Sequence, residues 1–251
     1  MKKLSRFEWT FLLAVFKIKR LVGQFFGTRT LDYMKKPLCI TTRNLREYTT
    51  RARSVAKEPE TAAWLDSLPA DGVLYDIGAN VGAYSLIAAS RGIRVYAFEP
   101  MSQNVEALQE NIALNGLSER VAVLPFILGS AAGLSSFSIP DTTHGSSTGF
   151  FEGKQGNGVK RVMPILTLDE CVERFKLPPP TAMKIDVDGG ERDVLVGAMK
   201  VLVLPALQSI LIEVNDATRS PVEQVLTSAG FSLVAAHPRE IKETNLIFRR
   251  S

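Results

Sequence analysis

Hydrophobic residues gather in short uninterrupted runs from residue 73 onward, and most runs are followed by apolar residues at helical spacing. Apolar runs of four to eight residues are typical of strands covered on both faces, whereas steps of three and four indicate amphipathic helices. The expected strands cover residues 73–77, 94–98, 121–128, 182–187, 209–214, 231–235 and 245–248. The expected helices cover residues 81–91, 103–115, 168–175, 192–202 and 221–229.

This alternation predicts an α/β fold with a doubly wound, mostly parallel sheet of seven strands. Strands separated by helices of about ten residues form βαβ units, and such units give parallel pairing. No helix separates the last two strands, so we expect an antiparallel C-terminal hairpin at the sheet edge. Residues 129–162 are rich in Gly and Ser and carry two shorter β-like stretches, at 135–139 and 159–163.

The N-terminal part has a different pattern. Residues 43–68 have helical spacing, and Pro59 stands where a second helix can begin, because proline is tolerated in a first turn. Residues 4–25 place apolar side chains on one stripe of a helix. We therefore expect a basic, amphipathic helical extension over residues 1–57 and an α/β domain over residues 58–251.

The positive charge of the chain lies near its N-terminus. Residues 1–30 have a net charge of +6, and the rest of the chain sums to −2. Two interpretations stay open: the helix packs on the protein itself or on a partner chain, as in a homo-oligomer, or residues 1–28 contact anionic lipid. The longest apolar run, residues 11–16, is too short to span a bilayer, and no signal-peptide cleavage site follows it.

Composition excludes several classes of protein. With 45% hydrophobic and 22% charged residues, the chain is typical of a soluble globular protein. The main body has no basic stripe, so we expect no nucleic-acid partner. Cys39 and Cys171 have no nearby Cys or His, which excludes a disulfide framework and a zinc site and favours a reducing, cytoplasmic location.

The first strand of the α/β domain ends in a glycine-containing motif, DIGANVG. Gly78 permits a tight turn, Gly82 permits close packing of the next helix, and Asp76 is expected to place a carboxylate at the crevice mouth. The dinucleotide motif G-x-G-x-x-G is absent, because Asn80 stands where its second glycine would be. Asp76 would repel a phosphate, so a cationic ligand such as S-adenosylmethionine fits better, and an NAD-linked oxidoreductase is disfavoured.

The second strand ends in Glu99 and Pro100. Glu99 lies 21 residues after Gly78, a position from which a carboxylate can accept hydrogen bonds from ribose hydroxyls. NAD enzymes share this spacing, so it does not separate the two cofactors.

Together, four segments strongly resemble the FkbM family of methyltransferases: YDIGANVGAYS, AFEP, NIALNGL and KIDVDGGE. The resemblance covers roughly residues 58–250 and implies a Rossmann-like, class I methyltransferase fold with strand order 3-2-1-4-5-7-6. It also implies S-adenosylmethionine as the cofactor. The residues assigned to cofactor binding are Asp76, Gly78, Asn80, Gly82, Glu99, Pro100 and Asp186.

Acidic residues after the fourth strand are the candidate catalytic groups. Asp186, Asp188 and Glu191 are expected to face the same crevice as Gly78, and one of them could act as the base. The family often has Glu where this chain has Asp188. Glu191 could instead be a favourable acid in a helix first turn.

Two further arrangements stay open. His144, in a Gly/Ser-rich loop, could be the base. A divalent ion, magnesium or calcium, could bind among the acids with Glu213 and Asn215, although no residue is assigned as a metal ligand.

The family resemblance suggests O-methylation of a sugar hydroxyl in a glycan or glycosylated metabolite, as in polysaccharide biosynthesis. Two other functions remain as alternatives. One is a non-catalytic protein that binds S-adenosylmethionine or serves as a membrane-associated scaffold, and the other is the NAD-linked oxidoreductase.

Overall fold

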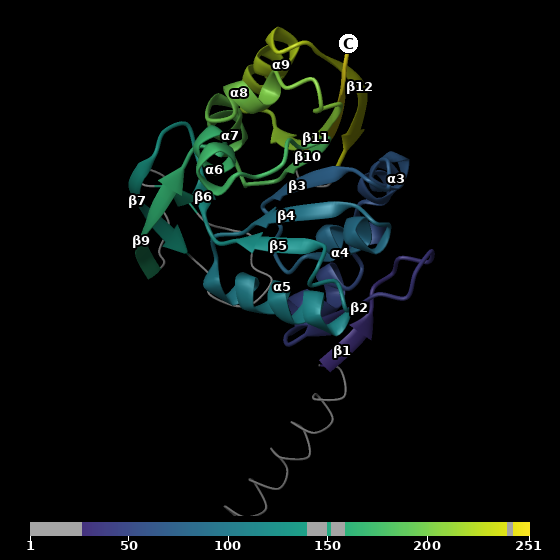
Figure 1. The fold of residues 1–251 in the computed structure, drawn as a ribbon. Coiled ribbons are helices and arrows are strands. Elements are labelled where there is room, and N and C mark those ends of the chain that lie inside the picture. The colour runs from purple at the N-terminus through teal and green to yellow at the C-terminus, as the bar shows by residue number, and fades with distance from the viewer. Residues whose placement is uncertain (1–26, 140–149, 152–158, 240–242) are drawn as a thin grey trace, which may run out of the picture.

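A seven-stranded sheet forms the centre of the computed structural model, which describes residues 27–139, 150–151, 159–239 and 243–251 (Figure 1). In this part of the chain the strand order is β12-β13-β11-β10-β3-β4-β5. The strands are β3 (Val73–Ile77), β4 (Arg94–Phe98), β5 (Val121–Leu124), β10 (Ala182–Ile185), β11 (Ser209–Asn215), β12 (Phe231–Pro238) and β13 (Glu243–Arg250). β13 is antiparallel to both its neighbours, and the other pairs are parallel. The predicted strand order and C-terminal hairpin are confirmed.

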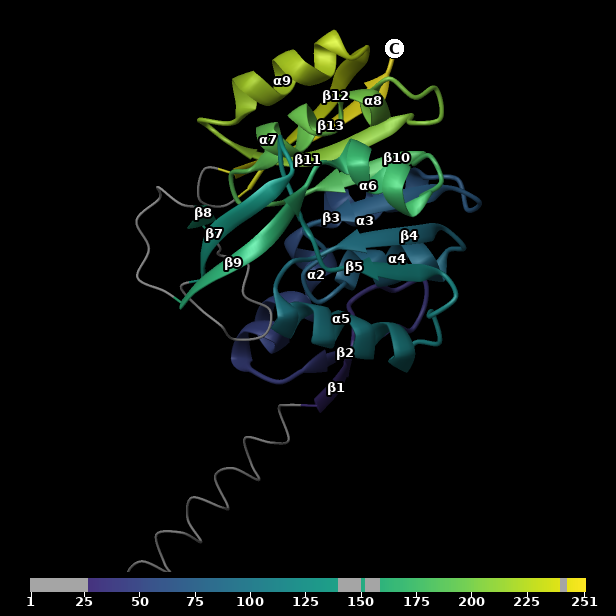
Figure 2. The ribbon, with the colours of Figure 1, turned by 60° about the vertical axis from the view of Figure 1, so that its left-hand side comes forward.

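Helices cover both faces of this sheet, as Figure 2 shows. One face packs against α3 (Pro59–Ser67), α4 (Ala83–Ser90) and α5 (Ser102–Leu114). The other packs against α6 (Leu168–Phe175), α7 (Glu191–Val196), α8 (Met199–Leu202) and α9 (Arg219–Ser228). Neighbouring strand residues point to opposite faces, so Leu74 joins the first core and Tyr75 the second.

A second sheet, not predicted as such, lies beside one end of the main sheet (Figure 2). It consists of β6 (Ile127–Leu128), β7 (Gly133–Ile139), β8 (Phe150–Phe151) and β9 (Val159–Leu166). The prediction of one strand over residues 121–128 is wrong, because the chain leaves the main sheet after Leu124. The amide of Phe126, the next one that would face β4, donates instead to the carbonyl of Leu124 at 2.9 Å, and β6 pairs with β9.

Two other predicted elements differ in extent. The helix expected over residues 192–202 divides into α7 and α8 at Gly197. The hairpin strands are longer than expected, so only residues 239–242 separate them.

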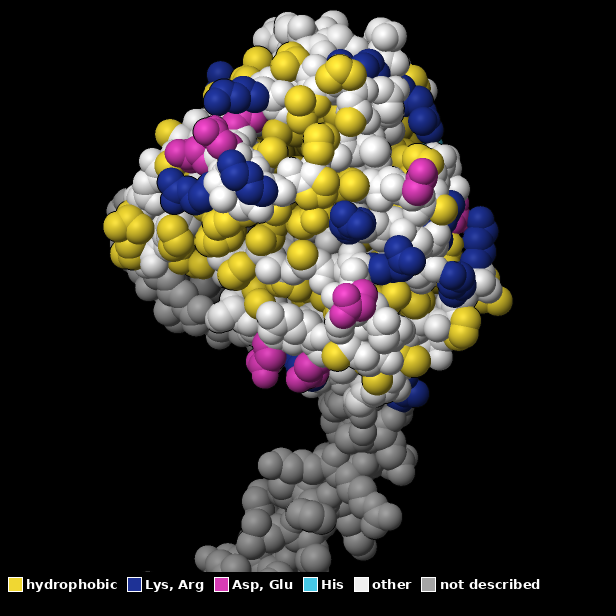
Figure 3. Space-filling view, in the orientation of Figure 1, with side chains coloured by type: hydrophobic (Ala, Val, Ile, Leu, Met, Phe, Trp, Pro, Cys, Tyr) yellow, Lys and Arg dark blue, Asp and Glu magenta, His cyan; other side chains and the backbone are white. Residues whose placement is uncertain are grey.

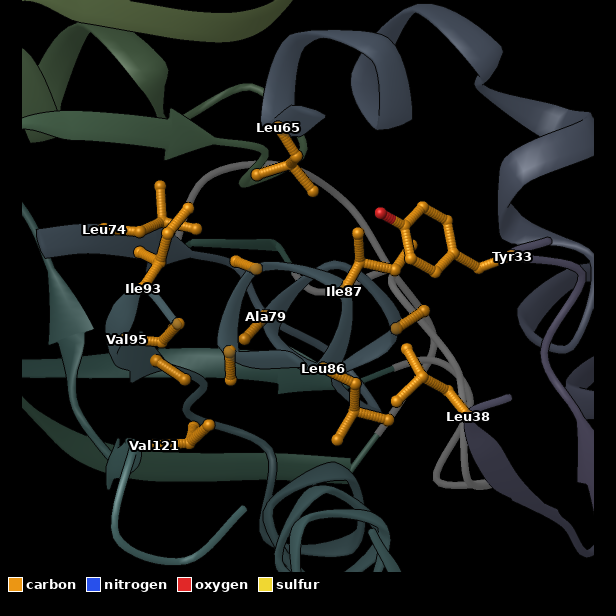
Figure 4. Packing of buried hydrophobic residues seen from close by; sticks show 14 of the residues in the cluster. Tyr33, Leu38, Leu65, Leu74, Ala79, Leu86, Ile87, Ile93, Val95 and Val121 are labelled. Atoms are coloured by element: carbon orange, nitrogen blue, oxygen red, sulfur yellow. The ribbon is translucent and has the colours of Figure 1, made fainter. Parts of the chain in front are cut away.

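The described part of the N-terminal segment packs on the α/β core. β1 (Gly27–Thr30) and β2 (Cys39–Thr42) form an antiparallel hairpin, followed by a helical turn, η1 (Glu47–Arg51), and by α2 (Ser54–Lys57). Tyr33 and Leu38 pack beside Ile87 of α4 (Figure 4). The helix expected over residues 4–25 lies outside the described residues. No helix that the structure describes has the length and apolarity needed to cross a bilayer.

Asparagine side chains of α5 attach β2 to the domain. Asn115 exchanges two hydrogen bonds of 2.7 Å with the backbone of Cys39, and Asn111 Oδ1 accepts from the amide of Thr41 at 2.7 Å. Both asparagines belong to the NIALNGL segment, which therefore connects β2 to the α/β core.

Candidate active site

A cleft lies where β3, β4 and β10 end, the edge at which doubly wound sheets bind ligands. It holds about 1000 Å³ of space, counting the part open to solvent. The predicted site residues that line it are Gly78, Asn80, Glu99, Pro100, Asp186 and Asp188. β11 and β13 contribute Glu213 and Glu243 to its wall.

The turn after β3 brings two strand ends into close contact. Gly78 has a φ of +84°, and a Cβ atom there would lie 1.8 Å from the carbonyl oxygen of Asp186. The amides of Gly78 and Ala79 both donate to the carbonyl of Phe98, at 2.9 and 3.0 Å. A side chain at Gly78 would therefore separate β3 from β10 and disrupt the floor of the cleft.

Gly82 has a packing role away from the cleft. Its φ is +91°, and a Cβ atom there would lie 2.2 Å from Cδ1 of Leu108 in α5. Gly82 is not among the cleft-lining residues, so the structure gives it no direct contact with a ligand.

Glu99 is held in place by backbone amides at the edge of the cleft. Oε2 accepts from the amide of Asn80 at 2.8 Å, and Oε1 accepts from that of Met101 at 2.9 Å. Burial raises the pKa of Glu99 to about 7, although these hydrogen bonds offset part of the rise. A carboxylate has about four lone-pair sites, so Glu99 can also accept hydrogen bonds from hydroxyls in the cleft.

The expectation that Asp76 stands at the crevice mouth is wrong. Its side chain is 1% exposed and points toward α4, where it accepts a hydrogen bond from Ser85 at 2.6 Å. Asp76 precedes Ile77, the last residue of β3, and alternation along the strand turns it away from the cleft. Burial raises the pKa of Asp76, and the positive charge of Lys184 opposes that rise.

Asp186 carries a stable negative charge at the end of β10. Lys184, with a side chain only 2% exposed, donates from Nζ to Asp186 Oδ2 at 2.9 Å and lies over the ring of Tyr84. Burial opposes ionisation of Asp186, but the charge of Lys184 outweighs it and lowers the pKa to about 2. The sequence reasoning missed Lys184, although a lysine within the apolar run AMKI was a visible signal.

Asp188 faces the open side of the cleft. It adopts a φ of +53°, which is uncommon for a residue other than glycine. Desolvation by the surrounding cleft walls raises the pKa of Asp188 to about 7 although its side chain is exposed at the cleft opening, and the like charges of Asp186, Glu191 and Glu243 add to the rise. A carboxyl group that titrates near neutral pH is suited to accept a proton from a substrate.

The structure does not place Glu191 in the cleft. Its side chain is buried in the first turn of α7, and Oε1 accepts from the amide of Gly189 at 2.7 Å. This arrangement agrees with the alternative that Glu191 is a helix N-terminal acid, because its carboxylate braces the turn that carries Asp188. His144 lies outside the described residues.

The far wall of the cleft contains residues that sequence reasoning did not assign. Arg51 and Lys57 line it from η1 and α2. Arg239 Nη1 lies 2.6 Å from Oε1 of Glu58 and 2.6 Å from Oε2 of Glu213, so it connects the N-terminal segment to β11. No local sequence pattern marks these residues, because distant segments bring them together.

The metal alternative finds no support in the described part of the chain. There, no group of three or more His, Cys, Asp or Glu side chains is arranged to hold a metal ion. Asn215 accepts hydrogen bonds from the amides of Ala217 and Thr218, and it does not line the cleft. On the face shown in Figure 3, Lys and Arg side chains are interspersed with apolar and acidic ones.

Comparison with known proteins identifies relatives of this chain. Residues 76–233 match the methyltransferase FkbM domain. The chain is 31% identical over 176 residues to the hexuronic acid methyltransferase AglP of Haloferax volcanii, a match covering 67% of this chain and 66% of AglP. It is 24% identical over 198 residues to the methyltransferase sdnD of Sordaria araneosa, covering 66% of this chain and 76% of that protein.

The fold also resembles a solved structure. The crystal structure of methyltransferase FkbM from Methylobacillus flagellatus superposes with a TM-score of 0.51 at 16% identity, over 73% of this chain and 45% of that one. At that identity the likeness concerns the fold alone.

Proposed function

The chain belongs to the FkbM methyltransferase family, and we propose that it transfers the methyl group of S-adenosylmethionine to a hydroxyl of a sugar. Membership of this family makes the chain a methyltransferase that uses S-adenosylmethionine. The observation that carries the proposal is the cleft itself, in which Glu99 and an ionised Asp186 stand on either side of the Gly78 turn.

The residues of the cleft fit S-adenosylmethionine. When bound, the cofactor supplies a methyl group made electrophilic by a sulfonium. Glu99 can accept hydrogen bonds from the ribose hydroxyls, and the carboxylate of Asp186 complements a positive charge. Pro100, next to Glu99, adds apolar surface to the same wall. The acids of this cleft would repel the pyrophosphate of NAD, which argues against the oxidoreductase alternative.

Asp188 is the best-placed base. It lines the cleft beside Asp186, and its pKa of about 7 allows it to accept the proton of an acceptor hydroxyl. The rest of the rate would come from alignment, because in-line displacement depends on how the acceptor oxygen is held. The hydrogen bond from the amide of Gly189 to Glu191 holds the turn that carries Asp188, which supports that alignment.

A polyhydroxylated acceptor suits the wall of the cleft that β11 and β13 form. Glu213 and Glu243 line this wall, and the oxygens of a carboxyl group accept hydrogen bonds from sugar hydroxyls. The relative AglP is, by its name, a methyltransferase of a hexuronic acid. We place the reaction in polysaccharide biosynthesis on the cytoplasmic side, and the contact of residues 1–28 with anionic lipid stays a prediction that vesicle sedimentation can test.

The proposal is tested by incubating the chain with S-adenosylmethionine labelled in its methyl group and a panel of sugars and oligosaccharides. We expect label in a base-stable methyl ether, and loss of most transfer in Asp188→Asn. Asp193→Asn, at an exposed acid of α7 outside the cleft, serves as the matched control and should keep full activity. Binding of the cofactor without transfer to any sugar would favour the non-catalytic alternative, and a base-labile product would indicate a carboxyl acceptor.

A further inference from the structure

The charges of the cleft are unequally distributed between its walls. Among the described residues, five acids line it, namely Glu99, Asp186, Asp188, Glu213 and Glu243. The cations that line it, Arg51 and Lys57, both come from the segment formed by η1 and α2. This segment precedes the region that matches the family, residues 76–233.

This distribution limits how S-adenosylmethionine can lie in the cleft, on the premise that the proposed function is correct. The methionine end of the cofactor carries a carboxylate as well as an ammonium group. The carboxylate would be repelled by the acids of the cleft that are ionised, above all Asp186, unless a cation stands beside it. The η1–α2 segment is therefore the part of the wall that suits it.

Arg51 is better placed for this contact than Lys57. Burial is the larger influence on the pKa of Glu99 and of Asp188, and it raises both values. The positive charge of Arg51 opposes these two rises, and it also helps to keep Asp186 ionised. Arg51 is thus within electrostatic reach of the acids at the ends of both β4 and β10. Lys57 has the larger effect on the pKa of Asp186, but its side chain is exposed and it is not a main influence on Glu99 or Asp188.

Several hydrogen bonds hold the segment that carries Arg51. The hydroxyl of Tyr84 donates to the carbonyl of Ser54 at 3.0 Å. Asp32 accepts from the amides of Val55 and Ala56, at 2.9 and 2.7 Å. Because the backbone of this segment is already held, it need not become ordered when a ligand binds, which favours tight binding.

We propose that Arg51 binds the methionine carboxylate of S-adenosylmethionine through its guanidinium group. Arginine suits this contact because its planar fork can form two parallel hydrogen bonds to one carboxylate. Arg51 is then a cofactor-binding residue from outside the family-matched region.

Calorimetric titration with S-adenosylmethionine and with its decarboxylated form tests this inference. In Arg51→Gln we expect affinity for S-adenosylmethionine to fall by about ten- to a hundredfold, the loss of one charge-assisted contact. Affinity for the decarboxylated form should stay within about twofold of the wild type, because it lacks the group that Arg51 binds. Arg51→Lys keeps the charge without the fork and should lie between.

Arg53→Gln is the matched control, since Arg53 is an exposed cation of the same segment that does not line the cleft. It should change neither affinity. Equal losses for both ligands in Arg51→Gln, or no loss for either, would overturn the proposal. A selective loss of affinity for S-adenosylmethionine in Lys57→Gln but not in Arg51→Gln would show that Lys57 binds the carboxylate, and this result would also overturn the proposal. Failure of the wild-type chain to bind either ligand would instead contradict the proposed function.

Discussion

Glu99 and Asp186 line the same cleft, yet their surroundings give them different charge states. Glu99 accepts hydrogen bonds from backbone amides but has no cation in direct contact among the described interactions, so burial dominates and its pKa rises to about 7. Asp186 has Lys184 at 2.9 Å, and its pKa falls to about 2. One carboxyl group is therefore ready to titrate on ligand binding, while the other keeps a fixed charge.

Glu99 should make the stability of the ligand-free chain depend on pH. Its pKa is about 7 in the folded state and lies near 4.5 without that environment, so the folded state retains a proton that the unfolded state releases. The contribution of Glu99 to the free energy of unfolding is complete below about pH 4 and should decline by about 3 kcal/mol as the pH rises to about 8. Asp188 titrates in the same range, so in Glu99→Gln the decline measured by urea unfolding should be smaller than in the wild type by the part that Glu99 contributes. An unchanged pH dependence in the variant would contradict the assigned pKa.

Asp188 should govern the pH dependence of methyl transfer. Because it must be ionised to accept a proton, the rate should rise with pH through about 7 and level off above that value. Asp188→Asn should lower the rate by about a hundredfold or more and remove the rise. A pH–rate profile of the wild type and the variant checks this, and a variant that keeps the rise would assign the base to another group.

Sequence alone placed Gly78, Glu99, Asp186 and Asp188 at the correct edge, since parallel strands end together there. It misplaced Asp76, whose orientation depends on the residue at which β3 ends. Arg51 could not have been predicted, because no local pattern connects residue 51 with a cleft at the ends of distant strands.

At the turn between β3 and α4, Gly78 lies very close to the backbone of Asp186. The effect of this close contact on stability can be tested separately from the effect of the positive φ. Gly78→Ala would add the cost of a positive φ and a clash with the carbonyl of Asp186, and should destabilise the chain by about 3 kcal/mol or more. Gly116→Ala is the matched control, since Gly116 has a φ of +65° but no atom within 4 Å of an added Cβ. It should cost about 1 kcal/mol in urea unfolding. Equal losses would show that the clash at Gly78 is relieved.

The apolar pattern predicted the positions of the main strands along the chain, and the family resemblance predicted their order in the sheet, but neither predicted the second sheet. β6 is only two residues long, and Pro125 lies inside what looked like one continuous strand. β7 and β9 pair with each other, so their stability depends on partners that the pattern of one segment does not reveal.

For the whole molecule, Arg239 connects the N-terminal segment to the C-terminal half of the sheet. It lies between Glu58 and Glu213, and all three side chains are at most 12% exposed. Arg239→Met would remove the cation that lies between two buried acids, leaving Glu58 only its ion pair with Lys57, and should lower the free energy of unfolding by about 3 kcal/mol at neutral pH. The pKa of Glu58 is lowered by its cations although burial opposes this, so the loss should shrink as pH falls and that acid is protonated.

Urea unfolding at neutral and acidic pH measures this difference. Arg249→Met, at an exposed arginine of β13, is the control and should have a small effect at both pH values. A loss in Arg239→Met that does not change with pH would show that packing, and not charge, accounts for it.

The central claim is that this cleft binds S-adenosylmethionine, and calorimetric titration of the purified chain with S-adenosylmethionine, S-adenosylhomocysteine and NAD tests it most directly. The account predicts binding of the first two with micromolar affinity or tighter, strongly weakened in Glu99→Ala, and no binding of NAD. Binding of NAD, or of none of the three, would contradict it.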